Sequence, residues 1–359
     1  MQYLNPPILA LFQKRIPGDD ALLELAHLRF RESGLGMELH CGGADEIKQL
    51  LGFRPFPQAR AVVHLPHKIN LLSKEDVKQV IEIARACQDE VNGFVVHDQP
   101  EIIDHTEEYL AALSEIDAGL LSLSKGPYLY IEYACGLCPD FYISLVKKFS
   151  NLQKVSACID IGHFGIRQAR DYFEKIFPGM GICSLTSLTP VLPEIIEDVE
   201  NAAQSSLPLV LAVIRELAGL DKPLHFHLHD GHPLSTFSPF GVSDHLSFLH
   251  EIPIPFPFKG RGSLDPMFGP TGLSKIVSQT LAALDPDLIS FTLEIHPQEG
   301  RLPLGPHAHL FTHWEDKTNG ERMNYWLDLL INNHFLVREA CKNFLENRAG
   351  SGIFNHLTT

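Results

Sequence analysis

The chain is poor in basic residues and has no basic run. Its 359 residues contain 29 Lys and Arg against 44 Asp and Glu, which gives a formal net charge of −15. Such a surface repels phosphate backbones at long range. We therefore expect no nucleic acid among its partners.

Long hydrophobic runs are missing as well. The longest apolar run, Leu207–Ile214, is too short to span a bilayer. The N-terminal apolar stretch lacks the basic lead and the small-residue cleavage site of a signal peptide. The seven cysteines are odd in number and irregularly spaced, which argues against a disulfide framework. We therefore expect a cytoplasmic protein with reduced thiols and no membrane partner.

Several catalytic motifs are also absent. The sequence contains no G-x-S-x-G, no Walker loop and no dinucleotide fingerprint, so serine hydrolase and NAD-dependent dehydrogenase functions lack support. Histidine, by contrast, is abundant, with 19 residues. Because imidazole is the commonest metal ligand among side chains, this abundance prompts a search for a metal site.

The hydrophobic pattern predicts eight short strands separated by segments of helix length. Apolar, often β-branched runs alternate with amphipathic ones, which is typical of parallel βα units. Ser73, followed by Glu75 and Asp76, predicts the start of one helix. The predicted strands cover residues 8–12, 36–41, 61–65, 93–97, 128–132, 155–160, 224–229 and 290–295. This pattern predicts an α/β fold, a single (β/α)₈ TIM barrel.

We expect one domain over residues 1–359, with the barrel core at about 7–297. Two regions exceed a minimal barrel. The segment after the sixth strand, residues 162–223, is enlarged. A C-terminal extension, residues 298–359, contains a His-rich loop with His307, His309 and His313 and a helical stretch from about 321 to 346. No low-complexity linker separates these regions from the barrel.

Metal-binding side chains stand at the ends of six predicted strands. In a (β/α)₈ barrel the C-terminal strand ends meet at one mouth, which holds the active site. Carboxylate and imidazole ligands suit Zn²⁺, Mn²⁺, Fe²⁺ or Co²⁺. The six residues are His64, His97, Glu132, Asp160, His227 and Glu294. We predict that the four strongest of these positions bind one divalent metal ion.

Six segments around these residues carry a family resemblance. In chain order they are VVHLPHKINL from Val62, YIEYACG around Glu132, CIDIGHFGI from Cys158, HFHLHDG from His225, FKGRGSLD from Phe258 and TLEIHP around Glu294. Their order and spacing over about residues 7–297 resemble the xylose isomerase-like TIM barrels. That superfamily includes sugar isomerases and epimerases and the endonuclease IV type of nuclease.

The resemblance implies roles for these residues. Glu132, Asp160, His227 and Glu294 match the shared metal quartet, and His163 matches a residue that contacts substrate in isomerases and binds a further metal in the nuclease branch. His64 and His97 match ligands of an additional metal in that branch. Asp244 and His245 resemble its D-x-H pair, although here the two residues are adjacent.

Two activities follow from the resemblance. The first is a sugar or sugar-phosphate isomerase or epimerase, in which a metal polarises a carbonyl while Glu132 and Glu294 move the neighbouring proton and His163 contacts the substrate. A substrate-binding arginine of some epimerases is replaced here by HPLS. The alternative is a multinuclear phosphoesterase of the endonuclease IV type. A degenerate barrel used for binding would hold no metal.

Other residues keep two interpretations. We expect His225 to be a core histidine and His229 to support a ligand; Asp230 either orients a ligand imidazole or caps the following loop. Lys259 and Arg261 flank a glycine-rich turn that binds an anion or is simply solvated. The expected partner is a small carbohydrate or phosphorylated metabolite, and the sequence leaves a homo-oligomer open.

Overall fold

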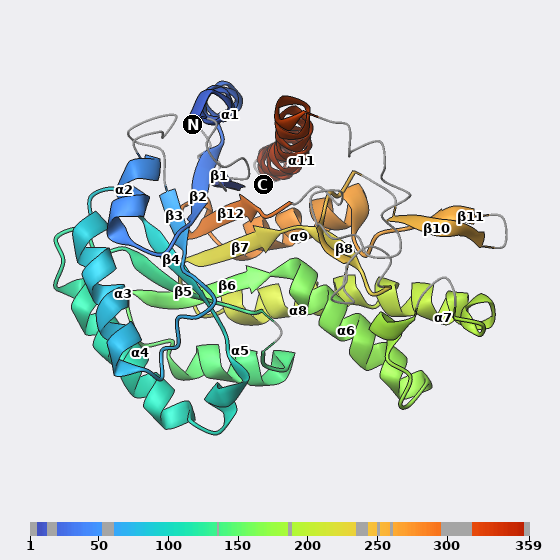
Figure 1. Ribbon diagram of the computed structural model, residues 1–359, viewed down its shortest axis with the longest axis horizontal. Coiled ribbons are helices and arrows are strands. Elements are labelled where there is room, and N and C mark those ends of the chain that lie inside the picture. The colour runs from blue at the N-terminus through green and yellow to red at the C-terminus, as the bar shows by residue number, and fades with distance from the viewer. Residues whose placement is uncertain are drawn as a thin grey trace.

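A closed barrel of eight parallel strands forms the centre of the molecule (Figure 1). The computed structural model describes residues 6–12, 20–51, 61–134, 136–185, 189–234, 243–249, 252–258, 261–295 and 318–354. The barrel strands are β1 (Ile8–Phe12), β2 (Gly36–His40), β3 (Ala61–His64), β4 (Gly93–His97), β5 (Tyr128–Glu132), β6 (Val155–Asp160), β7 (Leu224–Leu228) and β12 (Ile289–Leu293). Their order around the barrel, β1-β12-β7-β6-β5-β4-β3-β2, confirms the predicted (β/α)₈ fold.

The strand bounds agree closely with the sequence pattern. β1, β4, β5 and β6 begin and end where they were predicted, while β2, β3 and β7 each stop one residue earlier. β12 covers Ile289–Leu293 rather than residues 290–295. The backbone N–H of Glu294 nevertheless still donates to the carbonyl of Leu228 at 3.2 Å, so the chain keeps its place beside β7 past the end of the strand.

Helices cover the outside of the barrel, and most follow a strand. They are α1 (Asp20–Ser33), α2 (Ala44–Leu51), α3 (Lys74–Cys87), α4 (Thr106–Leu121), α5 (Pro139–Lys148), α6 (Ile161–Ile176), α7 (Leu192–Gln204), α8 (Ser206–Ala218), α9 (Gly269–Ala283) and α11 (Asn319–Phe354), with short 3₁₀ turns η1 (Pro100–Ile103), η2 (Ile182–Ser184) and η3 (Pro286–Leu288). Ser73 caps α3 as predicted, because its hydroxyl accepts the N–H of Asp76 at 3.3 Å.

The enlarged segment after β6 contains η2, α7 and α8, and two antiparallel ribbons follow β7. The ribbons pair β8 (Asp230–His232) with β9 (Ser243–Leu246) and β10 (Ile252–Phe258) with β11 (Arg261–Leu264). These additions gather with α7 on one side of the barrel, at the right of Figure 1. They have a hydrophobic cluster of their own, in which Phe173 and Val199 pack with Leu246 and Leu264.

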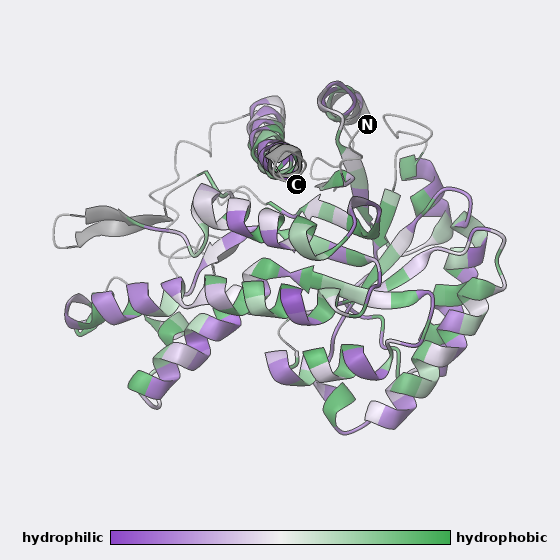
Figure 2. Cartoon of the chain, turned by 180° about the vertical axis from the view of Figure 1, so that it is seen from behind, coloured by the Kyte–Doolittle hydropathy of each residue, from purple (hydrophilic) through white to green (hydrophobic). Residues whose placement is uncertain are grey.

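The C-terminal helix α11 lies beside α1 and packs on α9 (Figure 1). It extends past the predicted range of about 321 to 346 at both ends. Asn333 of α11 is buried, and its side chain accepts the N–H of Phe248 at 3.1 Å and donates to the Ser247 hydroxyl at 2.9 Å. In Figure 2 the strands are mainly hydrophobic, while the helices alternate hydrophilic and hydrophobic bands. Among the described residues, no helix combines the length and apolar character that crossing a membrane requires.

Side chains inside the barrel form two successive layers. We call the lower layer Leu9, Glu38, Val62, Val95, Tyr130, Cys158, His225 and Thr292. The upper layer is His40, His64, His97, Glu132, Asp160, His227 and Glu294. Each upper-layer residue follows a lower-layer residue by two positions, so both point to the same face of the sheet. The upper layer lies at the C-terminal strand ends, where a TIM barrel holds its active site.

Candidate metal centre

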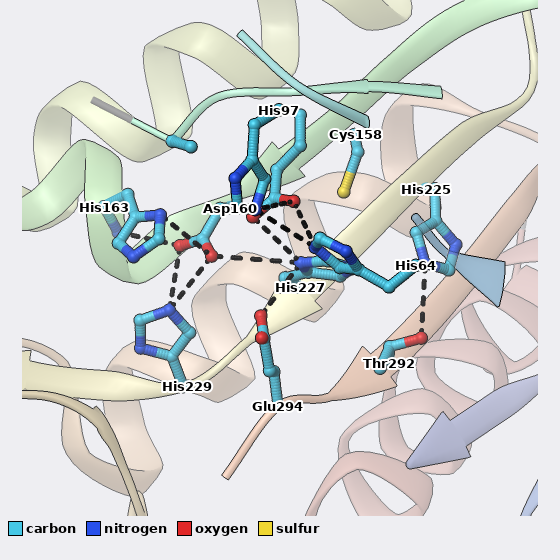
Figure 3. Close-up of polar contacts among 12 residues, drawn as sticks. His64, His97, Cys158, Asp160, His163, His225, His227, His229, Thr292 and Glu294 are labelled. Carbon is cyan, nitrogen blue, oxygen red and sulfur yellow. Dashed lines mark hydrogen bonds and ion pairs between the residues drawn. The ribbon is translucent and has the colours of Figure 1, made fainter. Parts of the chain in front are cut away.

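The predicted quartet converges on one point in the upper layer. Figure 3 shows three of its members, Asp160, His227 and Glu294, pointing toward one another. One ligand atom from each of Glu132, Asp160, His227 and Glu294 lies within 4.8 Å of the others. His227 Nδ1 is 2.9 Å from Glu294 Oε2, 3.2 Å from Glu132 Oε1 and 3.9 Å from Asp160 Oδ2. All four residues are buried. Three carboxylates therefore surround a single imidazole nitrogen.

A second group lies on the β3–β4 side of the quartet. His64 Nε2 is 2.8 Å from Glu132 Oε2, and His97 Nε2 is 3.2 Å from the same oxygen. The two imidazole nitrogens are 3.2 Å apart. The strand register brings His97 next to Glu132, because the two residues pair directly across β4 and β5.

A third group lies on the opposite side, around Asp160. Ligand atoms of Asp160, His163, His229 and His245 all lie within 4.8 Å of one another. Asp160 Oδ2 is 3.3 Å from His163 Nδ1, and Asp160 Oδ1 is 2.9 Å from His229 Nε2. Asp160 also caps α6, since Oδ1 accepts the backbone N–H of His163 at 2.7 Å. His163 therefore turns into the site at the first turn of that helix.

His229 lies between Asp160 and the backbone of the loop after β7. The backbone N–H of His245 donates to His229 Nδ1 at 2.8 Å. Nδ1 also lies 3.0 Å from the Asp230 carbonyl oxygen, and Nε2 lies 3.0 Å from Asp160 Oδ2, so His229 contacts Asp160 through Nε2 in either tautomer. The ring is wedged against Gly162, where an added Cβ would lie 1.9 Å from His229 Cε1. The ring is therefore held in place against Asp160, and its supporting role stays a prediction.

His245 adopts a strained backbone to complete this group. Its φ is +57°, in the left-handed region that non-glycine residues seldom enter. Such a conformation costs about 1–3 kcal/mol and persists where the surroundings impose it. The His245 ring stacks on His229 at 4.2 Å, and His245 Nε2 lies 3.4 Å from Glu294 Oε1. Glu294 thus connects the third group to the quartet.

The electrostatics of the centre depend on imidazole–carboxylate pairs. Burial alone would raise the pKa of Glu132, but His97 and its neighbours outweigh this and hold the pKa well below its usual value. Burial is likewise outweighed at Glu294, where His245 lowers the pKa. For His64, burial would lower the pKa, yet the Glu132 carboxylate raises it to about 9. No Lys or Arg of the described segments pairs with these carboxylates.

The donor set fits a divalent metal ion. His64 Nδ1 donates to the carbonyl of Leu65 at 2.9 Å, so the ring presents its other nitrogen to Glu132. His227 Nε2 faces Glu38 at 3.0 Å and presents Nδ1 to the quartet. The remaining ring nitrogens, His64 Nε2 and His227 Nδ1, carry lone pairs that face carboxylate oxygens. Such a contact is attractive only when a cation, either an extra proton or a metal ion, lies between the two atoms. Imidazole and carboxylate ligands are those of Zn²⁺, Mn²⁺, Fe²⁺ and Co²⁺.

Several residues of the site were not singled out from the sequence. His67 Nδ1 is 2.6 Å from His97 Nδ1, and the His40 ring stacks on His64 at 5.0 Å. Glu38 lies beneath the quartet in the lower layer. His40 and Glu38 alternate on β2 as the ligand residues do on the other strands, which is the one signal that could have revealed them.

The alternatives left open for Asp230 and His225 are now decided. Asp230 accepts the N–H groups of Gly231, Phe268 and Gly269 and so caps its own loop and the start of α9. It orients no ligand imidazole among the described residues. His225 is a fully buried core histidine, as expected. The Asp244 and Arg261 side chains, together with Lys259, His307, His309 and His313, lie outside the described residues.

Comparisons with known proteins give only distant likenesses. No protein-family model matches the chain, and no curated protein matches its sequence. The carboxyl transferase domain of Rhizobium etli pyruvate carboxylase with pyruvate is similar over 94% of this chain, at 11% identity and a TM-score of 0.36, and the match spans 49% of that chain. A family 1 β-glucosidase from Thermotoga maritima matches over 80% of this chain and 77% of its own, at 11% identity and a TM-score of 0.34. The TIM-barrel assignment rests on the closed strand order itself.

Proposed function

We propose that the protein is a multinuclear metal-dependent hydrolase that cleaves a phosphoester bond. The observation that carries this proposal is the sharing of carboxylates between neighbouring ligand groups. Glu132 directs Oε2 to His64 and His97 and Oε1 to His227. Asp160 likewise faces both His227 and His163. Carboxylates shared in this way hold ions side by side, as two-metal hydrolytic sites require.

The chain would hold its ions in the three groups described above. The quartet offers Glu132, Asp160, His227 and Glu294 as ligands. The second group offers His64, His97 and Glu132, and the third offers Asp160, His163 and His245, with Asp244 as the further candidate. Bound divalent ions supply positive charge to the attacking and leaving oxygens of a phosphoester. Resemblance to the endonuclease IV branch of the xylose isomerase-like barrels supports the same assignment.

The exposure of the ligands defines where substrate enters. Glu132, Asp160 and His227 are at most 1% exposed and form the floor. The side chains of His97 and His163 are each 16% exposed and form the rim. Substrate therefore approaches the rim imidazoles while the floor carboxylates hold their positions. The charge of −15 favours a small phosphorylated metabolite over a nucleic acid.

Metal content tests the proposal directly. We expect protein purified without chelators to contain two or three ions of Zn, Mn, Fe or Co per chain by elemental mass spectrometry, and to hydrolyse a chromogenic phosphodiester. His163→Ala should lower the ion count, because one ion loses an imidazole. His105→Ala, at a 55% exposed side chain, is the matched control. One ion per chain, unchanged by His163→Ala, would contradict the proposal.

A second candidate, the sugar isomerase or epimerase, is favoured by one feature. Glu132 and Glu294 both reach His227 Nδ1 but come from β5 and the end of β12. Two such carboxylates are suited to remove a proton beside a carbonyl and to return it. This function predicts one ion per chain and incorporation of solvent deuterium into a ketose substrate. Here His163→Ala would slow turnover without changing the ion count.

A further inference from the structure

We infer that Glu38 is a positioning residue that fixes the metal ligand His227 from beneath the site. The inference rests on the metal centre of the proposed function but concerns a residue outside its ligand groups. Glu38 lies at the middle of β2, in the lower layer, and is fully buried. The next two strands, β3 and β4, carry Val62 and Val95 in this layer, so a charged side chain here requires a physical explanation.

Three donors surround the Glu38 carboxylate. His227 Nε2 is 3.0 Å from Oε1, His225 Nε2 is 3.0 Å from Oε2, and the Thr292 hydroxyl donates to Oε2 at 2.5 Å. An ionised carboxylate only accepts hydrogen bonds, so both imidazoles must donate their Nε2 protons. These donors offset the large free energy that burying a carboxylate costs.

The contact with Glu38 decides which nitrogen His227 presents to the metal site. With its Nε2 proton held by Glu38, a neutral His227 has its lone pair on Nδ1. That nitrogen is the one 2.9 Å from Glu294 and 3.2 Å from Glu132. A carboxylate that holds the outer N–H of a ligand imidazole fixes its tautomer and orientation and makes it a better ligand.

His225 holds Glu38 in turn. Its Nδ1 lies 2.6 Å from the Ser290 hydroxyl, and its ring stacks on Tyr130 at 5.2 Å. The ring therefore has a partner at both nitrogens and cannot rotate without losing them. The chain Ser290–His225–Glu38–His227 runs from the lower layer to the metal site and joins β12, β7 and β2. Together these hydrogen bonds fix the direction in which His227 Nδ1 points.

The test compares Co²⁺ binding with the stability of chelated protein. Glu38→Leu removes the acceptor of both imidazoles, and Glu38→Gln keeps the volume but leaves only one accepting atom. We expect Glu38→Leu to weaken Co²⁺ binding, measured by chelator competition and by the visible absorption of the bound ion, by about 10–100-fold. Glu38→Gln should weaken it less. Thr292→Val, which leaves Oε1 and His227 untouched, should bind nearly as wild type does.

A merely structural role would give a different pattern. It would lower the thermal midpoint of chelated protein in both Glu38 variants and leave Co²⁺ affinity at the wild-type value, which would overturn the inference. Positioning predicts instead that the metal-induced rise in thermal midpoint shrinks more than the chelated midpoint falls. Wild-type protein that binds no Co²⁺ would overturn the metal centre together with the role of Glu38. Unchanged affinity in both variants would overturn the role of Glu38 alone.

Discussion

The two layers inside the barrel occupy the same strands, two residues apart, and differ in how their polar groups are paired. In the lower layer, Glu38 finds donors in His225 and Thr292. In the upper layer, nitrogen faces nitrogen, as between His64 and His97 at 3.2 Å, and three carboxylates approach one imidazole. The polar groups of the lower layer are therefore paired among themselves and with His227, while those of the upper layer require cations, either protons or metal ions.

This difference separates folding from function. Buried carboxylates cost several kcal/mol each unless charges and hydrogen bonds offset that penalty. The upper layer thus makes the folded barrel less stable when no cation is bound, and the apolar part of the lower layer and the shell between barrel and helices carry the stability. Variants of the upper-layer ligands should therefore change ion binding, while variants of the apolar lower-layer residues should change stability.

The largest effect is expected at the carboxylate shared by two ligand groups. Glu132→Gln removes the charge that serves both His64 and His227, so we expect at least one ion per chain to be lost. Phosphodiester hydrolysis should fall on the order of a thousandfold, since a metal supplies several kcal/mol of charge stabilisation. Elemental analysis and initial rates measure both effects. Glu216→Gln, at a 55% exposed side chain, is the control and should change neither.

A cavity in the lower layer should lower the stability of the protein and leave its ion content unchanged. Leu9 is fully buried and packs with Val62 and Val95. We expect Leu9→Ala to lower the free energy of unfolding by about 2–5 kcal/mol, the usual range for such truncations. Denaturant titration with saturating metal and with chelator should give the same loss. An ion count that fell with Leu9→Ala under folding conditions would show that the layers are not separate.

One histidine of each layer, His64 and His225, contributes pH dependence of opposite sign to the stability of chelated protein. The pKa of His64 is raised to about 9, so its stabilising contribution is complete below about pH 6.5 and is lost as pH rises through 9. Burial lowers the pKa of His225, so its contribution is lost as pH falls below about 6.5.

His64→Gln should therefore flatten the decline of unfolding free energy between pH 6.5 and 9. The slope removed is at most about 1.4 kcal/mol per pH unit. His334 serves as the control, because burial lowers its pKa to about 4 and His334→Gln should change the acid range alone. A wild-type slope retained in His64→Gln would mean that other groups carry the pH dependence.

The barrel and the quartet could be predicted from sequence because both depend on local pattern. Each strand is a short apolar run, and the position of Glu132 or Asp160 at its end is a matter of counting residues. Parallel strands then bring these ends to one mouth whatever the details of packing. The roles of the quartet as metal ligands remain a prediction that metal analysis must test.

The rest of the site depends on contacts between distant residues. Glu38 contacts His225 and His227, which are 187 and 189 residues further along the chain. The sequence of the strand, GMELH, does not indicate these contacts. His67 lies in the connection after β3, whose course is set by packing rather than by alternation. The sequence pattern therefore indicated the candidate ligands at the strand ends but not Glu38, His40 and His67, which contact them.

The smallest effect tests how the upper layer is held on the side of the third group. Gly162 lies in the first turn of α6 under the His229 ring, and an added Cβ would meet three atoms of that ring within 2.7 Å. Alanine is the better helix former by about 1 kcal/mol, so any loss in Gly162→Ala comes from displacing His229. We expect the affinity for the ion held by Asp160 to fall by about tenfold, which is the lower end of the range for residues that support a ligand. Gly43→Ala, where no atom lies within 4 Å of the added Cβ, is the matched control. Competition with graded chelators measures the affinity, and equal affinities in the two variants would show that the position of His229 does not govern ion binding.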